Sequence, residues 1–262
     1  GSRIKRRNPE SGTTTNVYNS NGTLASVTDA KGQKKTFVYD SYNRVTAVRR
    51  WKDSTTEDVN QKVEYYYDSN PFEGDLNSNV AGRLAAVRYW GLRGEAYGCC
   101  QPAEYAEIIE SYGYTSAGTV TKKRMRVRAR KSTSHSYVDA VLETQYTYDS
   151  EGRRTQMKYP AAAGWARTFD YTYNNMGRAS TMTEALQGGG TTTWVSTVTY
   201  NVAGQVTSGP HGTYQYNILG QMTRQTHSGT TFDEKYEYSL TQNNGKMISK
   251  ENVVSGENVV YT

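Results

Sequence analysis

Short stretches of alternating apolar and polar residues recur along the chain, and a tyrosine closes each of them. Phe37 stands two positions before Tyr39, and Tyr146 stands two positions before Tyr148. Residues two apart point to the same face of a β-strand, so each such pair marks one face. Strict alternation over so few residues is typical of half-buried strands rather than helices. The pattern therefore predicts a chain built from short β-strands.

The tyrosine strands end in a common motif, Tyr-Asp/Asn-x-x-Gly, followed by a polar and an apolar residue. Clear copies read YNSNGTL, YDSYNRV, YDSEGRR, YNNMGRA, YNVAGQV and YNILGQM, a weaker copy reads YTSAGTV, and two more are interrupted. The anchor tyrosines are Tyr18, Tyr39, Tyr67, Tyr114, Tyr148, Tyr173, Tyr200, Tyr216 and Tyr238. The repeat glycines are Gly22, Gly82, Gly118, Gly152, Gly177, Gly204, Gly220 and Gly245. Internal repetition of this kind indicates an array of equivalent structural units.

Each copy predicts a β-hairpin. Asp or Asn is favoured at the first position of a type I turn, and the glycine then takes the left-handed conformation of a G1 bulge. Asn43 replaces the glycine in the second copy, and asparagine tolerates a positive φ well. After the turn, apolar residues such as Leu24 and Val27 are three apart, which breaks alternation and predicts a bulge or a strand end.

The repeats organise most of the chain. Residues 16–262 are predicted to form the array, with insertions near 71–80 and 91–106, and residues 1–15 are set apart as a leading segment. Gly1-Ser2 has the form of a remnant left after tag removal. No run of 18 apolar residues occurs, so no membrane span is expected. The predicted fold class is all-β, an array of antiparallel hairpins forming one curved sheet.

Composition supports a thin sheet. The chain has 262 residues, of which 23 are Tyr and only 4 are Phe, and its mean hydropathy is −0.82. A tyrosine ring can be buried while its hydroxyl stays hydrogen-bonded, so such a chain needs no thick apolar core. The net charge of +6 is modest for this length and argues against a dedicated nucleic-acid binder.

The sharpest charge feature is the segment KKRMRVRARK. At strand period, Arg124, Arg126, Arg128 and Arg130 face one side of a strand. The row is a candidate contact for a polyanion such as an acidic glycan. The alternative is a solvated face, or a row paired with Glu and Asp of a neighbouring strand. We favour the alternative because the net charge is small and no aromatic residue interleaves the arginines.

No catalytic motif is present in the sequence. His135, His211 and His227 lie in unrelated contexts, and the aspartates mostly occupy turn positions. The adjacent Cys99 and Cys100 exclude a disulfide framework and leave two thiols or a vicinal disulfide. We therefore expect no enzyme activity and no cofactor.

A metal site is not expected either. Asp75-x-Asn77-x-Asn79 places oxygen ligands at alternate positions, as a calcium loop would. The segment lacks the glycine and the closing glutamate of such a loop, so a polar insertion is the favoured interpretation.

The Tyr-Asp/Asn-x-x-Gly-Arg/Gln pattern resembles the YD repeat of the Rhs family, found in bacterial polymorphic toxins, the B and C components of toxin complexes, and teneurins. The resemblance covers about residues 16–250 and implies a long β-sheet that spirals into a hollow shell. In the toxins such a shell encloses a C-terminal effector. By this resemblance the chain is expected to enclose, scaffold or present other segments of a larger secreted or cell-surface protein. The family's self-cleaving end carries Asp-Pro elements, and the sequence has no Asp-Pro pair, so neither effector nor cleavage site is expected within it.

Two further expectations concern partners. The alternative function is a carbohydrate- or polyanion-binding adhesion module, because exposed tyrosines in a row can stack against sugar rings. Nucleic acid is not expected as a partner. Unpaired edge strands at the ends of an array invite self-association.

Overall fold

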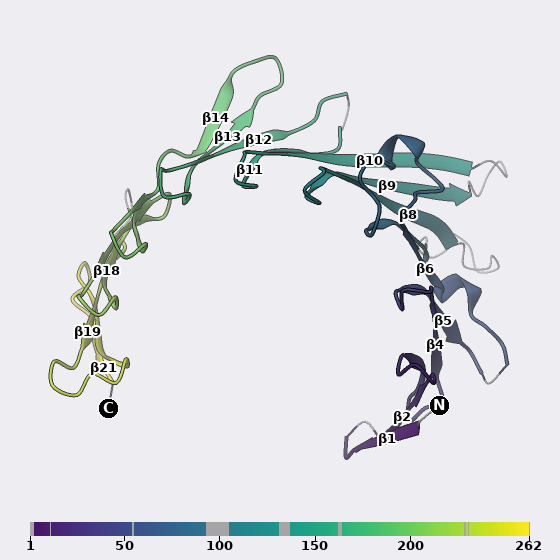
Figure 1. Cartoon of the computed structure of the whole chain (residues 1–262). Coiled ribbons are helices and arrows are strands. Elements are labelled where there is room, and N and C mark those ends of the chain that lie inside the picture. Colours follow the sequence, from purple (N-terminus) through teal and green to yellow (C-terminus); the bar gives the residue numbers. More distant parts are fainter. Residues whose placement is uncertain are drawn as a thin grey trace, which may run out of the picture. The chain divides into compact units, whose positions relative to one another are not determined.

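A computed structural model describes residues 3–10, 12–53, 55–92, 105–130, 137–161, 164–227, 229 and 231–261. The described residues form 21 strands and two three-residue 3-10 turns, η1 (Val59–Gln61) and η2 (Gly74–Leu76) (Figure 1). The prediction of an all-β chain of antiparallel hairpins is confirmed. The chain divides into two compact units.

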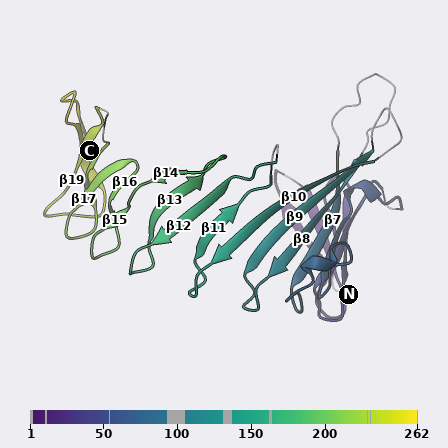
Figure 2. The same cartoon turned by 90° about the horizontal axis from the view of Figure 1, so that it is seen from above.

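The first unit comprises residues 1–146 and 159–161. Its strands are β1 (Arg3–Asn8), β2 (Gly12–Tyr18), β3 (Leu24–Thr28), β4 (Lys34–Tyr39), β5 (Val45–Trp51), β6 (Val63–Tyr67), β7 (Leu84–Leu92), β8 (Tyr105–Tyr114), β9 (Val120–Arg130) and most of β10 (Tyr137–Tyr148). Each strand pairs antiparallel with the next strand of the chain. Figure 2 shows β7 to β10 side by side in this order.

The second unit comprises residues 147–158 and 162–262. It contains β11 (Arg154–Lys158), β12 (Thr168–Tyr173), β13 (Ala179–Ala185), β14 (Thr191–Val195), β15 (Thr199–Tyr200), β16 (Val206–Gly209), β17 (Gly212–Tyr216), β18 (Met222–Thr226), β19 (Asp233–Tyr238), β20 (Met247–Asn252) and β21 (Asn258–Val260). Strands β15 to β21 form a seven-stranded sheet in chain order.

The break before β15 differs from the expectation of one continuous sheet. Strand β14 pairs with β13 as far as Val195 opposite Met182. Beyond the break, the N–H of Val198 donates to the carbonyl of Ser180, also in β13, at 2.8 Å. Strands β14 and β15 are therefore two halves of one strand beside β13, and the ladder is interrupted between them.

The leading segment is part of the sheet. Residues 3–15, which the sequence pattern set apart, form β1 and half of β2, and these two strands pair from Arg3 opposite Val17 to Asn8 opposite Gly12. Gly12 has a φ of 79°, which turns the chain between them. Four of the five residues from Thr13 to Val17 are β-branched, which suits a strand, although the run does not carry the tyrosine motif.

The two expected insertions have different outcomes. Residues 71–80 contain η2 and fold back onto the first unit. Strand β7 extends to Leu92 and β8 begins at Tyr105, so the second insertion is shorter than expected at both ends. Residues 93–104, which include Cys99 and Cys100, lie outside the described part.

Buried apolar side chains are few among the described residues, and most of them gather near the first insertion. They are Ala47, Leu76, Val80, Ala85, Ala86, Ala106 and Ile109. This small core agrees with the thin sheet that the composition predicts. In the described part of the chain, no helix has the length and apolar character needed to cross a membrane.

Candidate functional site

The repeat turn is a hydrogen-bonded loop centred on its acid or amide. In the second repeat, the Asp40 N–H donates to the Arg44 carbonyl at 3.0 Å, and the Asn43 N–H donates to the Asp40 carbonyl at 3.1 Å. Asp40 Oδ1 also accepts from the N–H groups of Tyr42 and Arg44, both at 2.9 Å. Asn43, in the glycine position, has a φ of 61°. This is the pattern of a hairpin connection closed by a G1 bulge.

A second irregularity follows each turn on the returning strand. Tyr18 pairs with Leu24, whereas its neighbour Val17 pairs with Ser26, so Ala25 is the extra residue of a bulge. Because Val27 pairs with Asn16, the bulge returns Leu24 and Val27 to the same face of the sheet. The three-position spacing between the apolar residues Leu24 and Val27 thus predicted a bulge that the structure contains.

The anchor tyrosines connect successive repeats through their hydroxyl groups. The Tyr39 hydroxyl donates to the carbonyl of Leu24, in the preceding repeat, at 2.8 Å. The same contact joins Tyr114 to Leu84 at 2.6 Å and Tyr200 to Ala179 at 2.7 Å, and Tyr173 makes it to Arg154 at 2.8 Å. In each case the acceptor is the second residue after the preceding turn's glycine. This bond explains why tyrosine rather than phenylalanine recurs at this position.

The basic residue that follows the repeat glycine lies over the ring of the next anchor tyrosine. The Arg44 guanidinium is 4.5 Å from the Tyr67 ring centroid, and the Arg153 guanidinium is 5.0 Å from that of Tyr173. Arg83 over Tyr114 and Arg178 over Tyr200 repeat the arrangement at 5.7 and 5.5 Å. Such cation–π contacts contribute about 0.5–1 kcal/mol each at exposed sites.

Where the basic residue is glutamine, a neutral contact replaces the cation–π contact. Gln205 Nε2 donates to the Gly220 carbonyl at 2.6 Å, and Gln221 Nε2 donates to Asn243 Oδ1 at 2.8 Å. The side chain after each of these glycines therefore reaches the next turn in both versions of the repeat. The sequence pattern marked the anchor tyrosines and glycines but missed this bridging role.

The repeat glycines all have positive φ, between 74° at Gly82 and Gly177 and 92° at Gly118. In the first interrupted copy the turn still closes across the insertion, because the Asp68 N–H donates to the Arg83 carbonyl at 3.1 Å. Gly82 N–H in turn donates to Asp68 Oδ1 at 2.6 Å. In the second interrupted copy, Gly245 has a φ of 84°.

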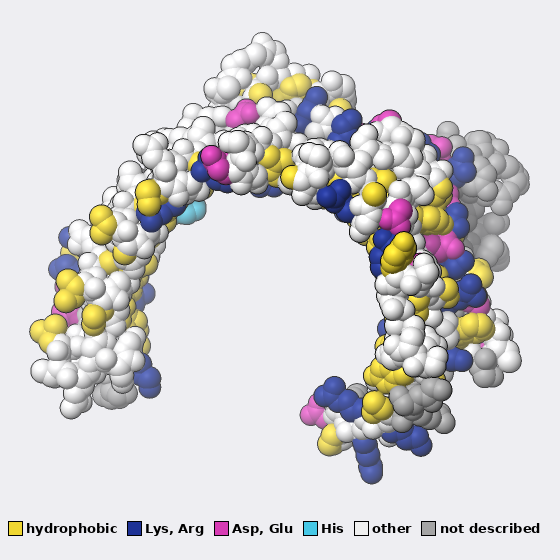
Figure 3. Space-filling view, in the orientation of Figure 1, with side chains coloured by type: hydrophobic (Ala, Val, Ile, Leu, Met, Phe, Trp, Pro, Cys, Tyr) yellow, Lys and Arg dark blue, Asp and Glu magenta, His cyan; other side chains and the backbone are white. Residues whose placement is uncertain are grey.

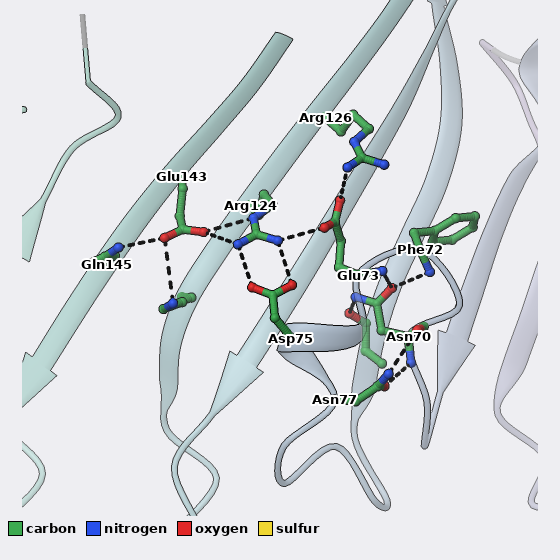
Figure 4. A network of polar contacts seen from close by, with 11 residues as sticks. Asn70, Phe72, Glu73, Asp75, Asn77, Arg124, Arg126, Glu143 and Gln145 are labelled. Atoms are coloured by element: carbon green, nitrogen blue, oxygen red, sulfur yellow. Dashed lines mark hydrogen bonds and ion pairs between the residues drawn. The ribbon is translucent and has the colours of Figure 1, made fainter. Parts of the chain in front are cut away.

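The arginine row lies on β9, and its members make ion pairs within the first unit (Figure 4). Arg124 is 2.7 Å from Glu73, 2.8 Å from Asp75 and 2.6 Å from Glu143. Arg126 reaches the other oxygen of Glu73 at 2.9 Å.

Farther along the row, the pairing becomes more exposed. Arg128 lies 3.2 Å from Asp139 on β10, with both side chains about half exposed. Arg130 belongs to β9, and its side chain lies outside the described part. The neighbouring strand thus supplies Glu143 and Asp139, as the paired-row alternative predicts.

The sequence pattern did not foresee the contribution of the insertion. Glu73, whose side chain is 8% exposed, and Asp75 come from the segment around η2 and reach β9. The hydrogen bonds from Arg124 hold the pKa of Asp75 below its ordinary value. Burial alone would raise the pKa of Glu143, but hydrogen bonds from Gln145 and Arg124 outweigh burial and lower it. Asp75 and Glu143 therefore stay ionised beside Arg124 and balance its charge.

The oxygen-rich residues of the insertion are engaged in protein contacts. Asn77 Oδ1 accepts from the Asn70 N–H, and Asn77 Nδ2 donates to the Asn70 carbonyl at 3.1 Å. Asn79 Nδ2 donates to the Tyr114 carbonyl at 3.0 Å. Within the described residues no three His, Cys, Asp or Glu side chains gather to hold a metal ion. His211 lies in the turn between β16 and β17, His227 follows β18, and His135 lies outside the described part.

The RHS Repeat family model matches residues 18–55, which span the first two clear copies of the motif. This stretch of the chain is therefore an RHS repeat. The resemblance inferred from the tyrosine motif is thereby confirmed. No curated protein sequence matches this chain.

The fold of this chain is similar to that of solved toxin-complex structures. A TcdB2–TccC3 complex without its hypervariable C-terminal region superposes with a TM-score of 0.70 at 16% identity, over 95% of this chain. A Photorhabdus luminescens Tc holotoxin pore with a mutated TccC3 gives a TM-score of 0.69, again at 16% identity over 95% of this chain. The chain spans 12% of the length of either solved chain.

Proposed function

We propose that this chain is a structural segment of an RHS-repeat shell, which scaffolds, encloses or presents other parts of a larger secreted or cell-surface protein. The proposed role is structural rather than catalytic. The fold supports it, since 95% of the chain superposes on 12% of a TcdB2–TccC3 chain. The remaining segments of the larger protein are its proposed partners, and an enclosed effector is the proposed cargo.

The observation that carries the proposal is the use of polar side chains within the array. Tyrosine hydroxyls bond to the preceding repeat, and arginines and glutamines reach the following turn. Arg124, the centre of the most basic segment, faces three carboxylates at 2.6 to 2.8 Å. A polyanion would have to displace these ion pairs, so the row gives more support to a scaffold than to a polyanion-binding module.

The two functions predict different behaviour for Arg124→Gln. In a scaffold, the change leaves the buried Glu73 without its main partner and lowers the free energy of unfolding by about 2 kcal/mol. The matched control is Arg50→Gln, because Arg50 is exposed and makes no ion pair among the described residues. We expect Arg124→Gln to lower the melting temperature and Arg50→Gln to leave it unchanged. Both variants should elute from a heparin column at the same salt concentration.

A binding module would give the opposite result. Arg124→Gln would then elute from heparin at much lower salt than Arg50→Gln while melting like the wild type. A specific hit of the wild-type chain on a glycan array, lost in Arg124→Gln, would equally contradict the scaffold proposal.

A further inference from the structure

A hollow of about 390 Å³ lies on one face of the first unit, where β5, β6 and β7 run side by side. Ala47, Glu64 and Arg88 lie opposite one another on these three strands. Arg49 and Trp90 each stand two residues farther along their strands, so they point to the same face. The connection from β5 to β6, which contains η1, forms a wall of the hollow.

The polar groups of this hollow are only partly paired. The Arg49 guanidinium stands 3.7 Å from the Glu57 carboxylate, which is beyond hydrogen-bond distance. Arg49 Nε and Glu57 Oε1 are shielded from water and have no hydrogen-bond partner among the described residues. An unmatched buried donor beside an unmatched buried acceptor is costly to keep. Both side chains are partly exposed, at 40% and 21%, so a small rotation presents both atoms to a ligand.

Two more side chains at the hollow have unused hydrogen-bonding groups. In the described part of the chain, neither the Asn60 side-chain amide nor the Trp90 indole N–H has a hydrogen-bond partner. The indole N–H groups of Trp51 and Trp194, by contrast, donate to Thr36 at 3.1 Å and to Glu184 at 2.8 Å. The Arg88 guanidinium lies over the Trp90 ring, 5.3 Å from its centroid. Trp90 therefore offers a ligand its N–H edge rather than an open ring face.

The charges around the hollow are balanced. Lys62 and Arg88 both contact the Glu64 carboxylate, each at 2.5 Å. Burial alone would raise the pKa of Glu64, but hydrogen bonds from Lys62 and Arg88 outweigh burial and lower it. Figure 3 shows basic, acidic and hydrophobic side chains mixed over the part of the molecule that carries β5 and β6. A balanced surface of this kind suits a ligand without a large net charge.

A second hollow, of about 620 Å³, continues the first along β5 and β6. Both hollows are lined by Arg49 and Lys62, so together they form one elongated depression, the β5–β6 groove. Val38 and Ala47, opposite each other on β4 and β5, line its middle, and Pro71 of the first insertion lines its far end. Hollows of this size are ordinary for ligand sites. Segments outside the tyrosine motif thus form both ends of the groove.

We propose that the β5–β6 groove binds an extended peptide segment of a partner protein through its main-chain amides. An amide carries an N–H donor next to a carbonyl acceptor, which matches Glu57 Oε1 and Arg49 Nε. A further carbonyl can accept from the Trp90 indole N–H. Because an extended peptide repeats this pattern along its length, it suits an elongated groove. A sugar ring is disfavoured, since it would stack on a ring face that Arg88 occupies. The inference does not depend on the shell function proposed above.

The test is a selection of random heptapeptides, displayed on phage, against the full chain. Enriched peptides are synthesised with acetylated and amidated ends, and their dissociation constants are measured by fluorescence anisotropy. We expect Arg49→Met and Glu57→Met each to weaken binding by about tenfold or more, because each removes a hydrogen bond to a charged group. Trp90→Phe keeps the ring and removes the N–H, so it should weaken binding less. Methylation of the contacted peptide nitrogen should abolish binding.

Two matched variants serve as controls. Arg50→Met changes the next residue of β5, which points to the opposite face, is exposed and makes no ion pair among the described residues. Trp194→Phe removes an indole N–H that bonds within the second unit. Both should bind the peptides as the wild type does. Circular dichroism of all five variants should match the wild type, because none of the changed groups holds the sheet together.

Three results would overturn the inference. The first is a selection from which no peptide binds the wild type at submillimolar concentration. The second is a set of peptides that bind Arg49→Met and Glu57→Met as tightly as the wild type, which would place the contact elsewhere. The third is a Trp90 indole N–H signal, assigned in NMR spectra with Trp90→Phe, that moves with methyl glucoside and with none of the peptides. That result would identify a sugar as the occupant.

Discussion

The bond between repeats can be tested by removing one oxygen atom. Tyr39→Phe deletes the hydroxyl that donates to the Leu24 carbonyl at 2.8 Å and keeps the ring in its place. Tyr39 is the clearest anchor for this test. In the preceding repeat, the residue after the turn glycine is Thr23, whereas in other repeats that position holds the arginine that lies over the next anchor tyrosine. The measured change therefore reports the hydrogen bond without a cation–π contribution from the preceding repeat.

The expected magnitude follows from the type of bond. A partly buried hydrogen bond between a neutral side chain and a carbonyl contributes about 0.5–1.5 kcal/mol net. For a chain of this size, each kcal/mol shifts the melting temperature by roughly 2–4 °C, so Tyr39→Phe should melt about 1–6 °C below the wild type. Thermal unfolding followed by circular dichroism, with urea unfolding as a second measure, gives the value.

Tyr42→Phe is the matched control, since that ring is 77% exposed at a turn tip and its hydroxyl bonds to no other described residue. It should melt within about 1 °C of the wild type, as surface changes usually do. Equal melting of Tyr39→Phe and Tyr42→Phe would refute the claim that the anchor hydroxyl stabilises the junction. Tyr39→Phe combined with Tyr114→Phe should give the sum of the two single changes, because distant sites act independently.

Two more predictions follow from the backbone and from the titration of a phenol. Gly212→Ala should destabilise far more than Gly152→Ala in urea unfolding, because a Cβ at Gly212 would lie 1.6 Å from the Thr226 carbonyl oxygen whereas one at Gly152 meets nothing within 4 Å; equal losses would contradict this. Burial, followed by the hydrogen bond to Glu234, raises the pKa of Tyr236 to about 12 from its ordinary value of 10.0. This phenol stabilises the fold below pH 10, and its contribution is lost as the pH rises through about 12, because only the unfolded chain ionises it in between. The difference in absorbance at the tyrosinate band between wild type and Tyr236→Phe should therefore have its midpoint near pH 12, and a midpoint near 10 would exclude the bond.

The turn and the bulge could be predicted from the sequence because both depend on local backbone chemistry. A glycine or Asn43 at the turn position requires positive φ, and the spacing from Leu24 to Val27 requires one extra residue in the strand. Neither inference needs to know which strands are neighbours. Hairpin order was predictable for the same reason, since each repeat encodes its own turn.

The contacts between repeats could not be predicted in this way. The position of Arg153 over Tyr173 depends on how one hairpin is staggered against the next, which the motif alone does not specify. The interruption between β14 and β15 likewise depends on pairing with β13 rather than on any local signal. The pattern set residues 1–15 apart as a leading segment and could not place residues 3–15 in the sheet, because a strand need not carry the tyrosine motif to pair with one that does.

The first insertion shows how the array acquires local features without losing its continuity. Asp68 closes its turn with Gly82 and Arg83 rather than with the residues that follow it directly, so the hairpin from β6 to β7 is kept across the inserted loop. The loop is then free to place Glu73 against Arg124, two strands beyond β7. The motif residues Asp68, Gly82 and Arg83 make the hydrogen bonds that close the repeat turn, whereas the inserted residues are not needed for it. Specific surface chemistry in such a chain should therefore be sought in insertions and turn tips rather than in the motif itself.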